Sequence, residues 1–542
     1  MSNRYFFTFL RKIRMKKFYI TTAIAYTNAK PHMGHALEII QADALARMYR
    51  IIGKDVAFQT WTDEHGVKNR RSAEKAGKDI KNFLDDIVTS YKDMYASLLV
   101  SYDTFLRTSD IEAHYPGAQK FWNKLVAAGD IYKKKYIWLY CAGCESFKTE
   151  KELVDGKCPD HPNGEIEKIE EENYFFALHK YKGQVIDLIK NNTYQIIPET
   201  RKNEILSFLE NANDVSFSRP KSSLPRGIPV PGDDDHVMYV WCDALSNYLT
   251  GQGYENDEKK FKNTRPADIH IIGKDILRFH AAFWPAMLLS AQIALPKKLI
   301  VHGHITLNGL KMSKSTGNTV DPMDILADYD RDAFVFQLLY DISVSSDGDF
   351  SLERLWNLYD SMLIGGRGNL VNRVTSLCKK YGITSGKFNK KKREIFKENN
   401  ESKLLKYIED WWDGADIQEQ YLKNADIKWY LDEWYQLVQW TNEYITKAEP
   451  RIKYKNETTK DEALADLQFL LYIVKNIALF SAPILVNGFK KIQTIFGNEE
   501  LSQIDSSKNT EEHQFKMIFD LEDFPVDLNP EIIYQKKEED KS

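Results

Sequence analysis

The sequence predicts an α/β fold, in which a Rossmann-like doubly wound parallel sheet is split by a metal-binding insertion and followed by an all-helical bundle domain. Three observations carry this prediction. The N-terminal part alternates apolar strands with helices, the same alternation resumes after an insertion at 115–228, and only helical periodicity remains after about residue 356. We therefore expect one sheet assembled from two separated stretches of chain.

The first stretch is predicted to contain a strand at 18–26, a helix at about 35–52 and a second strand at 56–62. A strand, loop, helix and strand in this order open a parallel α/β domain. Such sheets bind ligands at the carboxyl ends of their strands. The residues that carry chemistry are therefore expected just after the strands, in the PHMGH segment at 31–35 and the DEHG segment at 63–66.

The second stretch contributes predicted strands at 269–272 and 299–302. After it, large apolar residues recur every three or four positions, as at Trp434 and Leu437, which indicates the buried faces of helices. The predicted divisions are an N-terminal extension (1–15), two halves of the sheet domain (16–114 and 229–303), the insertion (115–228), a loop region (304–355), a helical domain (356–534) and a charged tail (535–542).

The composition limits the function classes. The chain of 542 residues carries 74 Lys and Arg against 78 Asp and Glu, so a polyanion has to be bound by local patches. The most apolar stretch, 467–486, contains Gln, Lys, Asn and Pro, so we expect a bundle helix and no membrane partner. Residues 1–14 are basic but lack a secretory signal. We expect a cytoplasmic protein, and a short organellar leader at 1–14 stays an alternative.

Three of the five cysteines cluster in a pattern that is typical of a metal site. Cys141-x-x-Cys144 is followed, after 13 residues, by Cys158-x-x-His161. A redox role for the first pair is the alternative, but the matched second pair favours zinc. Three thiolates and one imidazole complete a tetrahedral site and leave no position for water. We therefore predict one structural Zn²⁺ per chain.

Two polar segments are candidates for binding phosphate, although the chain has no P-loop motif. At 31–35, His32 and His35 stand at the start of a helix, which favours anions, and Gly34 allows a ligand to approach the backbone closely. The KMSKS segment at 311–315 offers two lysines in a loop, and such charges stabilise the transition state of nucleotidyl transfer. Taken singly, the histidines could be incidental and the lysines a solvated turn.

Together the two segments resemble the signature motifs of the class I aminoacyl-tRNA synthetases. Enzymes of this class for leucine, isoleucine and valine carry a larger editing insertion, and a cysteine enzyme would need a zinc thiolate site beside the first strand. The pocket candidates here are apolar and aromatic, which suits a thioether. From 16 to about 449 the chain resembles the methionyl-tRNA synthetase family, with further matching blocks at 60–66 (TWTDEHG), 239–244 (YVWCDA) and 272–276 (IGKDI).

This resemblance implies a ligase that converts L-methionine and Mg²⁺-ATP into methionyl-adenylate and pyrophosphate, and then transfers methionine to the 3′ end of tRNA(Met), initiator tRNA included. It also implies a loop region that contacts the tRNA stem. We expect a monomer, because no segment after the bundle is long enough for the family's dimerising domain. The implied catalytic residues are His32, His35, Lys311 and Lys314. The implied ATP-binding residues are His32, Gly34, His35, Lys274, Asp275, Lys311, Ser313, Lys314 and Ser315.

The implied methionine-binding residues are Ala23, Ile24, Tyr26, Asp63, Trp241, Leu245, Tyr248, His280 and Trp284. Among them, the Asp63 carboxylate would bind the substrate ammonium. The implied anticodon-binding residues are Asn369, Arg373 and Arg451. Arg451 stands where many relatives have tryptophan, and a guanidinium can also stack on a base. The alternatives are a class I synthetase for another amino acid and a tRNA-binding protein without catalysis.

Overall fold

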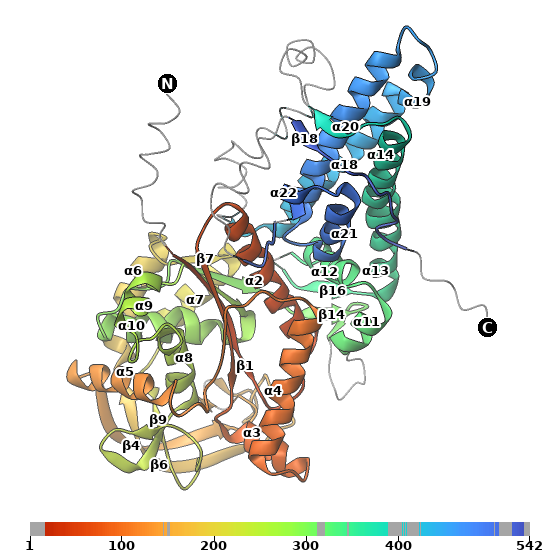
Figure 1. Cartoon of the computed structure of the whole chain (residues 1–542). Helices are drawn as coiled ribbons and strands as arrows, with labels where there is room; N and C mark the ends of the chain where they lie inside the picture. Colours follow the sequence, from red (N-terminus) through yellow and green to blue (C-terminus); the bar gives the residue numbers. More distant parts are fainter. Residues whose placement is uncertain are drawn as a thin grey trace, which may run out of the picture.

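The structure is a computed structural model, and its described part forms an α/β body and a helical body (Figure 1). The α/β body holds the N-terminal part of the chain, and the helical body holds the C-terminal part. The described residues are 17–144, 146–148, 152–311, 320–343, 346–387, 404, 406, 408, 422, 424–502, 504–508 and 523–535. The predicted extension, most of the charged tail, and the predicted site residues Ser313, Lys314 and Ser315 lie outside them.

The α/β body is built on one parallel sheet with the strand order β3-β2-β1-β12-β13-β7. Its strands are β1 (Phe18–Tyr26), β2 (Val56–Asp63), β3 (Thr104–Arg107), β7 (Gln195–Ile197), β12 (Ile269–Gly273) and β13 (Lys298–His302). Strands β1 and β2 come from the first predicted stretch, and β12 and β13 come from the second, so the predicted doubly wound sheet is confirmed. The strand order reverses between β1 and β12, where such sheets bind ligands.

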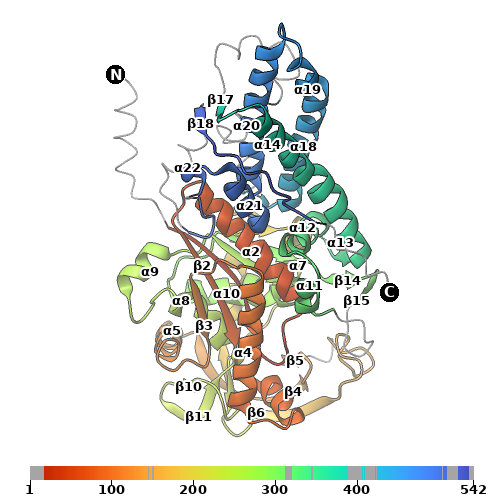
Figure 2. The same ribbon diagram turned by 45° about the vertical axis from the view of Figure 1, so that its right-hand side comes forward.

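Helices cover both faces of this sheet (Figure 2). These helices are α2 (Met33–Ile51), α4 (Ile80–Ser97), α5 (Tyr115–Ala127), α8 (Val240–Thr250) and α10 (Trp284–Ser290). Helices α2 and α4 share one apolar cluster with Ile271 and Ile300, whereas α5, α8 and α10 share another with Ile272 and Val301. Successive residues of a strand point to opposite faces, so apolar runs such as 269–272 supply both clusters.

The predicted metal ligands lie at one end of an antiparallel sheet with the order β5-β4-β6-β8. Its strands are β4 (Ile131–Cys141), β5 (Ser146–Lys148), β6 (Ile166–Phe176) and β8 (Val215–Ser216). Other parts of the predicted insertion lie elsewhere: β7 pairs with β13 in the central sheet, and α5 packs against α8. The range 115–228 is therefore not one separate unit in the structure. Strand β7 has only three residues, too few to produce a recognisable strand pattern.

The helical body confirms the predicted bundle. Its helices are α11 (Pro322–Asp328), α12 (Arg331–Asp341), α13 (Leu352–Leu358), η5 (Tyr359–Gly368), α14 (Asn369–Lys380), α18 (Ile427–Ala448), α19 (Pro450–Lys453), α20 (Lys460–Ser481), α21 (Val486–Phe496) and α22 (Glu499–Ser502). Trp434 is fully buried, and its indole N–H donates to the carbonyl of Ile477 at 3.1 Å. Within the described residues one helix, α20, is long and apolar enough to cross a membrane, but 83% of its most apolar window is buried in the protein.

Shorter elements connect these parts. They are α3 (Val67–Lys75), η2 (Leu178–Lys180), α6 (Lys182–Lys190), α7 (Glu199–Glu210), β9 (Ser218–Pro220), β10 (Pro229–Val230), β11 (Asp233–Met238), α9 (Glu258–Thr264), η3 (Lys274–Ile276), η4 (Phe279–Phe283), β14 (Ile305–Leu307), β15 (Leu310–Lys311), β16 (Gly348–Phe350), β17 (Ser385–Lys387) and β18 (Asp523–Pro525).

Buried polar contacts join the two bodies. In α2, the Arg47 guanidinium donates to the hydroxyl of Ser506 at 2.9 Å. In α12, the Arg331 guanidinium donates to the carbonyl of Leu98, the residue after α4, at 3.0 Å. Hydrogen bonds to buried charged groups are among the stronger ones in proteins. These contacts fix α2, whose N-terminus carries the predicted phosphate-binding histidines, relative to the helical body.

Candidate active site and metal centre

The N-terminus of α2 presents two imidazoles just beyond the end of β1. The backbone N–H of Gly34 donates to Nδ1 of His32 at 3.1 Å, and the backbone N–H of His32 donates to Nδ1 of His35 at 3.2 Å. A Cβ atom at position 34 would lie only 2.9 Å from the His32 ring, so glycine suits this turn. Since Nδ1 accepts in both rings, the proton of each neutral imidazole is on Nε2. The helix start therefore offers two Nε2–H donors.

The surroundings of His35 keep its imidazole neutral. Desolvation, together with the neighbouring His32 and His302, lowers the pKa of His35 well below its ordinary value. The hydroxyl of Tyr91, from α4, lies 3.2 Å from Nε2 of His35, and the two rings meet edge to face. Sequence reasoning found His35 through its motif but missed Tyr91, because a contact between two helices leaves no local pattern in the sequence.

Glu38, on the first turns of α2, connects this helix to two strands. Its Oε1 accepts from the backbone N–H of Ala23 in β1 at 3.0 Å, and its Oε2 lies 3.3 Å from Nε2 of His302 in β13. Nδ1 of His302 donates to the carbonyl of Gly303 at 2.9 Å. Both ring nitrogens of His302 thus face oxygen acceptors, one on β13's own segment and one on α2. Sequence reasoning missed both residues, although His302 ends a predicted strand, the position where ligand-binding residues are expected.

The segment after β12 contributes two predicted ATP-binding residues. Lys274 pairs with the Asp347 carboxylate at 2.7 Å, and Asp275 accepts from Nε2 of His304 at 2.7 Å. The hydrogen bond from Lys274 holds the pKa of Asp347 below its ordinary value. Lys311 is the last residue of β15, and the rest of the KMSKS segment lies outside the described residues. The carboxyl ends of β12 and β13 therefore add ionic groups beside α2.

Asp63 ends β2, where it stands opposite Tyr26 at the end of β1. The backbone N–H of His65 donates to Oδ1 of Asp63 at 3.3 Å, and the side-chain amide of Asn69 donates to the Asp63 carbonyl at 3.2 Å. Asp63 is only 2% exposed. The strand pattern of the sequence predicted that this carboxylate follows a strand. The structure places it at the carboxyl ends of two adjacent strands, β1 and β2.

The predicted apolar residues lie together on the other side of β1, between that strand, α8 and α10. The residues that share this cluster are Ala23, Ile24, Tyr26, Trp241, Leu245, Tyr248 and Trp284. Trp241 stacks on Phe279 with ring centroids 3.8 Å apart. The Trp284 indole N–H is buried and has no hydrogen-bond partner among the described residues. The cluster is apolar with a few polar groups, as is usual for sites that bind small molecules.

Two buried polar groups in this cluster form an ordered pair. Nδ1 of His280 donates to the carbonyl of Ile276 at 3.0 Å, so Nε2 accepts from the hydroxyl of Tyr248 at 2.8 Å. Burial lowers the pKa of His280 to about 4, so the imidazole is neutral at pH 7. Sequence reasoning included both residues only through the resemblance, since neither stands in a motif with a chemical signature.

The predicted metal ligands converge at the end of β4. Their four donor atoms, from Cys141, Cys144, Cys158 and His161, all lie within 4.8 Å of one another. Sγ of Cys144 is 3.4 Å from Sγ of Cys158 and 3.3 Å from Nδ1 of His161. Tetrahedral zinc with Zn–S of about 2.3 Å and Zn–N of about 2.0 Å places its ligand atoms roughly 3.5 to 3.8 Å apart. The predicted convergence of these four residues is confirmed, and their donor set fits zinc.

Comparisons of the sequence with known proteins show the family to which the chain belongs. The family described as "tRNA synthetases class I (M)" matches residues 18–167 and 162–375. The methionine–tRNA ligase of Caldanaerobacter subterraneus subsp. tengcongensis is 40% identical over 499 residues, which are 91% of this chain and 76% of the relative. The chain belongs to the methionyl-tRNA synthetases. The enzyme of Clostridium tetani is 42% identical over 90% of this chain and 74% of its own length.

Solved structures agree with this assignment of a methionyl-tRNA synthetase. The Mycobacterium tuberculosis methionyl-tRNA synthetase in complex with methionyl-adenylate superposes with a TM-score of 0.85 at 33% identity, covering 96% of this chain and all of that one. The apo form of the same enzyme superposes with a TM-score of 0.78 at 30% identity, covering 97% of this chain. The synthetase is thus an ATP-dependent ligase whose substrates are ATP, methionine and tRNA.

The three predicted anticodon-binding residues of the synthetase lie on exposed surfaces of the helical body. Asn369 and Arg373 stand one turn apart on α14, and both are exposed, whereas other residues form the buried face of that helix. The Arg373 guanidinium lies 3.5 Å from the side-chain oxygen of Asn442 in α18. Arg451 is exposed on α19. The shared face of Asn369 and Arg373 agrees with the predicted helical spacing.

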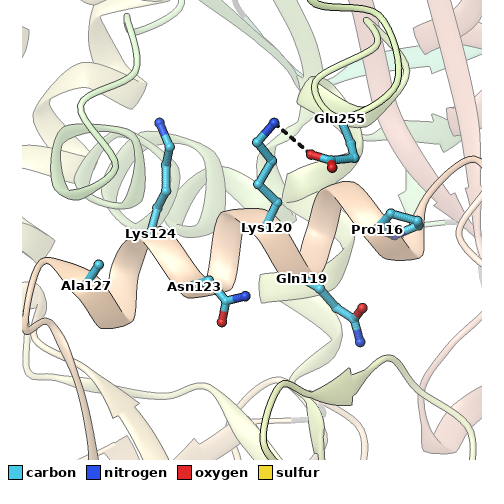
Figure 3. Close-up of a pocket in the computed structure, with 7 residues that line it drawn as sticks. All are labelled: Pro116, Gln119, Lys120, Asn123, Lys124, Ala127 and Glu255. Atoms are coloured by element: carbon cyan, nitrogen blue, oxygen red, sulfur yellow. Dashed lines mark ion pairs between the residues drawn. The ribbon is translucent and has the colours of Figure 1, made fainter.

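A surface hollow of the synthetase lies along α5 (Figure 3). Its lining residues are Pro116, Gln119, Lys120, Asn123, Lys124, Ala127 and Glu255. Lys120 pairs with Glu255 at 2.7 Å across it. None of the predicted site residues lines this hollow, so it is separate from the ends of the strands where those residues gather.

Proposed function

We propose that the synthetase activates L-methionine in the space between the N-terminus of α2 and the buried cluster on α8 and α10, with a defined role for each group. In the first step, a methionine carboxylate oxygen attacks the α-phosphorus of ATP, and the bond to pyrophosphate breaks. In the second step, a hydroxyl of the 3′-terminal ribose of tRNA attacks the carbonyl carbon, and AMP leaves. The substrate is Mg²⁺-ATP, so the metal arrives with the nucleotide.

One observation carries this proposal: the groups needed for both substrates gather at the carboxyl ends of adjacent strands. Asp63, at the end of β2, is the carboxylate for the methionine ammonium. The apolar cluster with Tyr248 and His280 accepts the thioether side chain. The remaining residues of the methionine site are Ala23, Ile24, Tyr26, Trp241, Leu245 and Trp284.

The phosphates belong at the start of α2. The Nε2–H groups of His32 and His35 donate to phosphate oxygens as negative charge develops there, and the helix N-terminus favours the same charge. Gly34 lets the nucleotide approach the backbone. The remaining ATP-binding residues are Lys274, Asp275, Lys311, Ser313, Lys314 and Ser315, with Lys311 and Lys314 on the leaving pyrophosphate.

The metal cluster holds one structural Zn²⁺, bound by its three thiolates and one imidazole. Because all four positions belong to protein groups, the ion supplies shape and no chemistry to the reaction. It stabilises the ribbon of β4 and β6 as a contact for the acceptor end of tRNA. The loop region at 304–355 contacts the tRNA stem.

The helical body reads the tRNA(Met) anticodon through Asn369, Arg373 and Arg451, in initiator and elongator tRNA alike. Polar side chains on an exposed helix face can hydrogen-bond unstacked bases, and the Arg451 guanidinium can stack on one. The synthetase acts as a monomer in the cytoplasm.

Amino acid-dependent ATP–pyrophosphate exchange tests the proposal. The purified full chain is assayed with each of the twenty amino acids, its zinc content is measured on the same sample, and aminoacylation of tRNA(Met) follows. We expect exchange with methionine alone, and about one zinc ion per chain. Exchange with another amino acid instead would contradict the methionine site. Silence with every amino acid, despite bound zinc, would contradict catalysis and leave tRNA binding.

A further inference from the structure

A fully buried carboxylate in the first turn of α8 lies between two histidines that the proposed mechanism does not use. Oδ2 of Asp243 is 2.5 Å from Nδ1 of His65, and Oδ1 is 2.8 Å from Nε2 of His114. The exposed fractions are 0% for Asp243, 2% for His65 and 1% for His114. The three residues come from α8, from the turn after β2 and from the segment before α5. The carboxylate therefore joins three separate parts of the chain.

The outer nitrogens of both imidazoles also have partners. The hydroxyl of Tyr115 lies 3.2 Å from Nε2 of His65, and the hydroxyl of Thr250 lies 2.8 Å from Nδ1 of His114. Each imidazole can thus donate to the carboxylate from one ring nitrogen while its other ring nitrogen faces a hydroxyl. Burial by itself raises the pKa of Asp243, but the two imidazoles outweigh it and hold that pKa below the ordinary value. The carboxylate is therefore ionised, and it is held by two donors.

We propose that Asp243, His65 and His114 form a positioning network for the methionine site. The inference rests on the proposed role of Asp63 as the ammonium ligand. The backbone N–H of His65 donates to Oδ1 of Asp63, so the place of His65 sets the orientation of that carboxylate. Through Asp243, the same histidine is tied to α8, the helix that carries Trp241, Leu245 and Tyr248.

The network thus sets the distance between the two ends of the bound amino acid. Its ammonium faces Asp63, and its side chain faces α8. The neighbouring Glu64 is held differently: it is buried against Arg107, which donates to Oε1 at 2.6 Å and to Oε2 at 2.8 Å. That ion pair fixes the turn to β3 and does not reach α8. The contact through His65 and Asp243 instead connects the ammonium ligand to α8.

Steady-state ATP–pyrophosphate exchange with four variants of the full chain tests this proposal. Asp243→Asn keeps the shape but replaces one acceptor oxygen by a donor, which opposes an imidazole donor. We expect KM for methionine to rise about tenfold, with KM for ATP and kcat changed less than twofold. Asp63→Asn is expected to raise the same KM by more. Thr250→Val removes only the hydroxyl beside His114, so it disturbs the fold less. We expect it to raise KM for methionine two- to threefold, and it still tests the network if Asp243→Asn does not fold.

The matched control is Asp332→Asn. This carboxylate is as buried as Asp243, but it lies inside the helical body, where it accepts from the backbone of Asn487 and Gly488. We expect it to lower the melting temperature without changing KM for methionine. If Asp243→Asn and Thr250→Val lower the melting temperature only, as the control does, while Asp63→Asn raises KM, the network has no positioning role. If Asp63→Asn leaves KM for methionine unchanged, the ammonium ligand itself is assigned wrongly.

Discussion

The two halves of the proposed active site, which we call the methionine half and the phosphate half, are built from different kinds of structure. In the methionine half, Tyr248, His280 and Trp284 are fully buried on helices that pack against the central sheet. In the phosphate half, His32 and Asp275 are exposed and stand at a helix start and after a strand end. The buried half is arranged before the substrate arrives, whereas the exposed half keeps donors available to solvent. This difference indicates that amino acid selection rests on packing, whereas phosphate chemistry rests on donors at the ends of secondary-structure elements.

The largest expected effect separates the two halves by function. His35→Ala removes a neutral donor from the phosphate half and leaves the apolar cluster intact. We expect kcat of methionine-dependent ATP–pyrophosphate exchange to fall by a factor of about 10² to 10³, because removal of one preorganised donor to a transition-state oxyanion lowers kcat by about this factor. The Kd of methionine, measured by calorimetry without ATP, should stay within a factor of about two.

Tyr91→Phe is the control for this prediction. It keeps the ring that packs on His35 and removes only the hydroxyl beside Nε2. We expect a fall in kcat of less than about tenfold, the range of a single hydrogen bond that acts through another group. A loss of methionine affinity as large as the loss of turnover in His35→Ala would assign His35 to the methionine half and remove the distinction.

The same distinction explains how far the sequence could be interpreted. The strands, the start of α2, Asp63 and the four metal ligands follow from local patterns, because each depends on neighbours within a few positions. Glu38 and Tyr91 were missed, because their roles depend on contacts between elements far apart in the chain. The three-residue β7 was missed for the same reason, since only pairing with β13 makes it a strand.

The second prediction uses pH to probe the buried half. Burial lowers the pKa of His280 to about 4 from an unfolded value near 6.5. Between these two values the unfolded chain binds a proton that the folded chain does not, so stability falls as the pH falls through 6.5. From pH 7 to pH 5 this one group should remove about 2 kcal/mol from the free energy of unfolding.

Urea unfolding at pH 7 and pH 5 measures this slope. In His280→Gln the amide oxygen can accept from Tyr248, but the titrating group is gone, so we expect a smaller loss of stability between the two pH values than in the unaltered chain. His35 and His270, whose pKa values are also lowered by burial, retain their own part of the slope. An identical slope with and without His280 would show that this imidazole is solvated in the folded protein.

A smaller effect should come from one hydroxyl of the buried half. Tyr248→Phe keeps the ring against Trp284 and removes the donor to Nε2 of His280. A buried acceptor that loses its partner costs about 1 kcal/mol, so KM for methionine should rise about fivefold, with KM for ATP unchanged. Exchange kinetics at saturating ATP measure it. An equal rise in both KM values would mean that the hydroxyl does not belong to the methionine half alone.

The smallest effect is expected where the two halves meet, at Glu38. Its carboxylate accepts from the backbone of β1 through Ala23 and faces His302 in β13, so it belongs to neither half alone. Glu38→Gln keeps an acceptor for Ala23 but turns an amide donor, in place of a carboxylate oxygen, toward Nε2 of His302. We expect KM for methionine and KM for ATP to rise together, by about two- to threefold, because one moderate hydrogen bond is weakened and no group that touches a substrate is removed. If only KM for methionine rises, Glu38 belongs to the methionine half, and if only KM for ATP rises, it belongs to the phosphate half. Either result would mean that Glu38 does not connect the two halves.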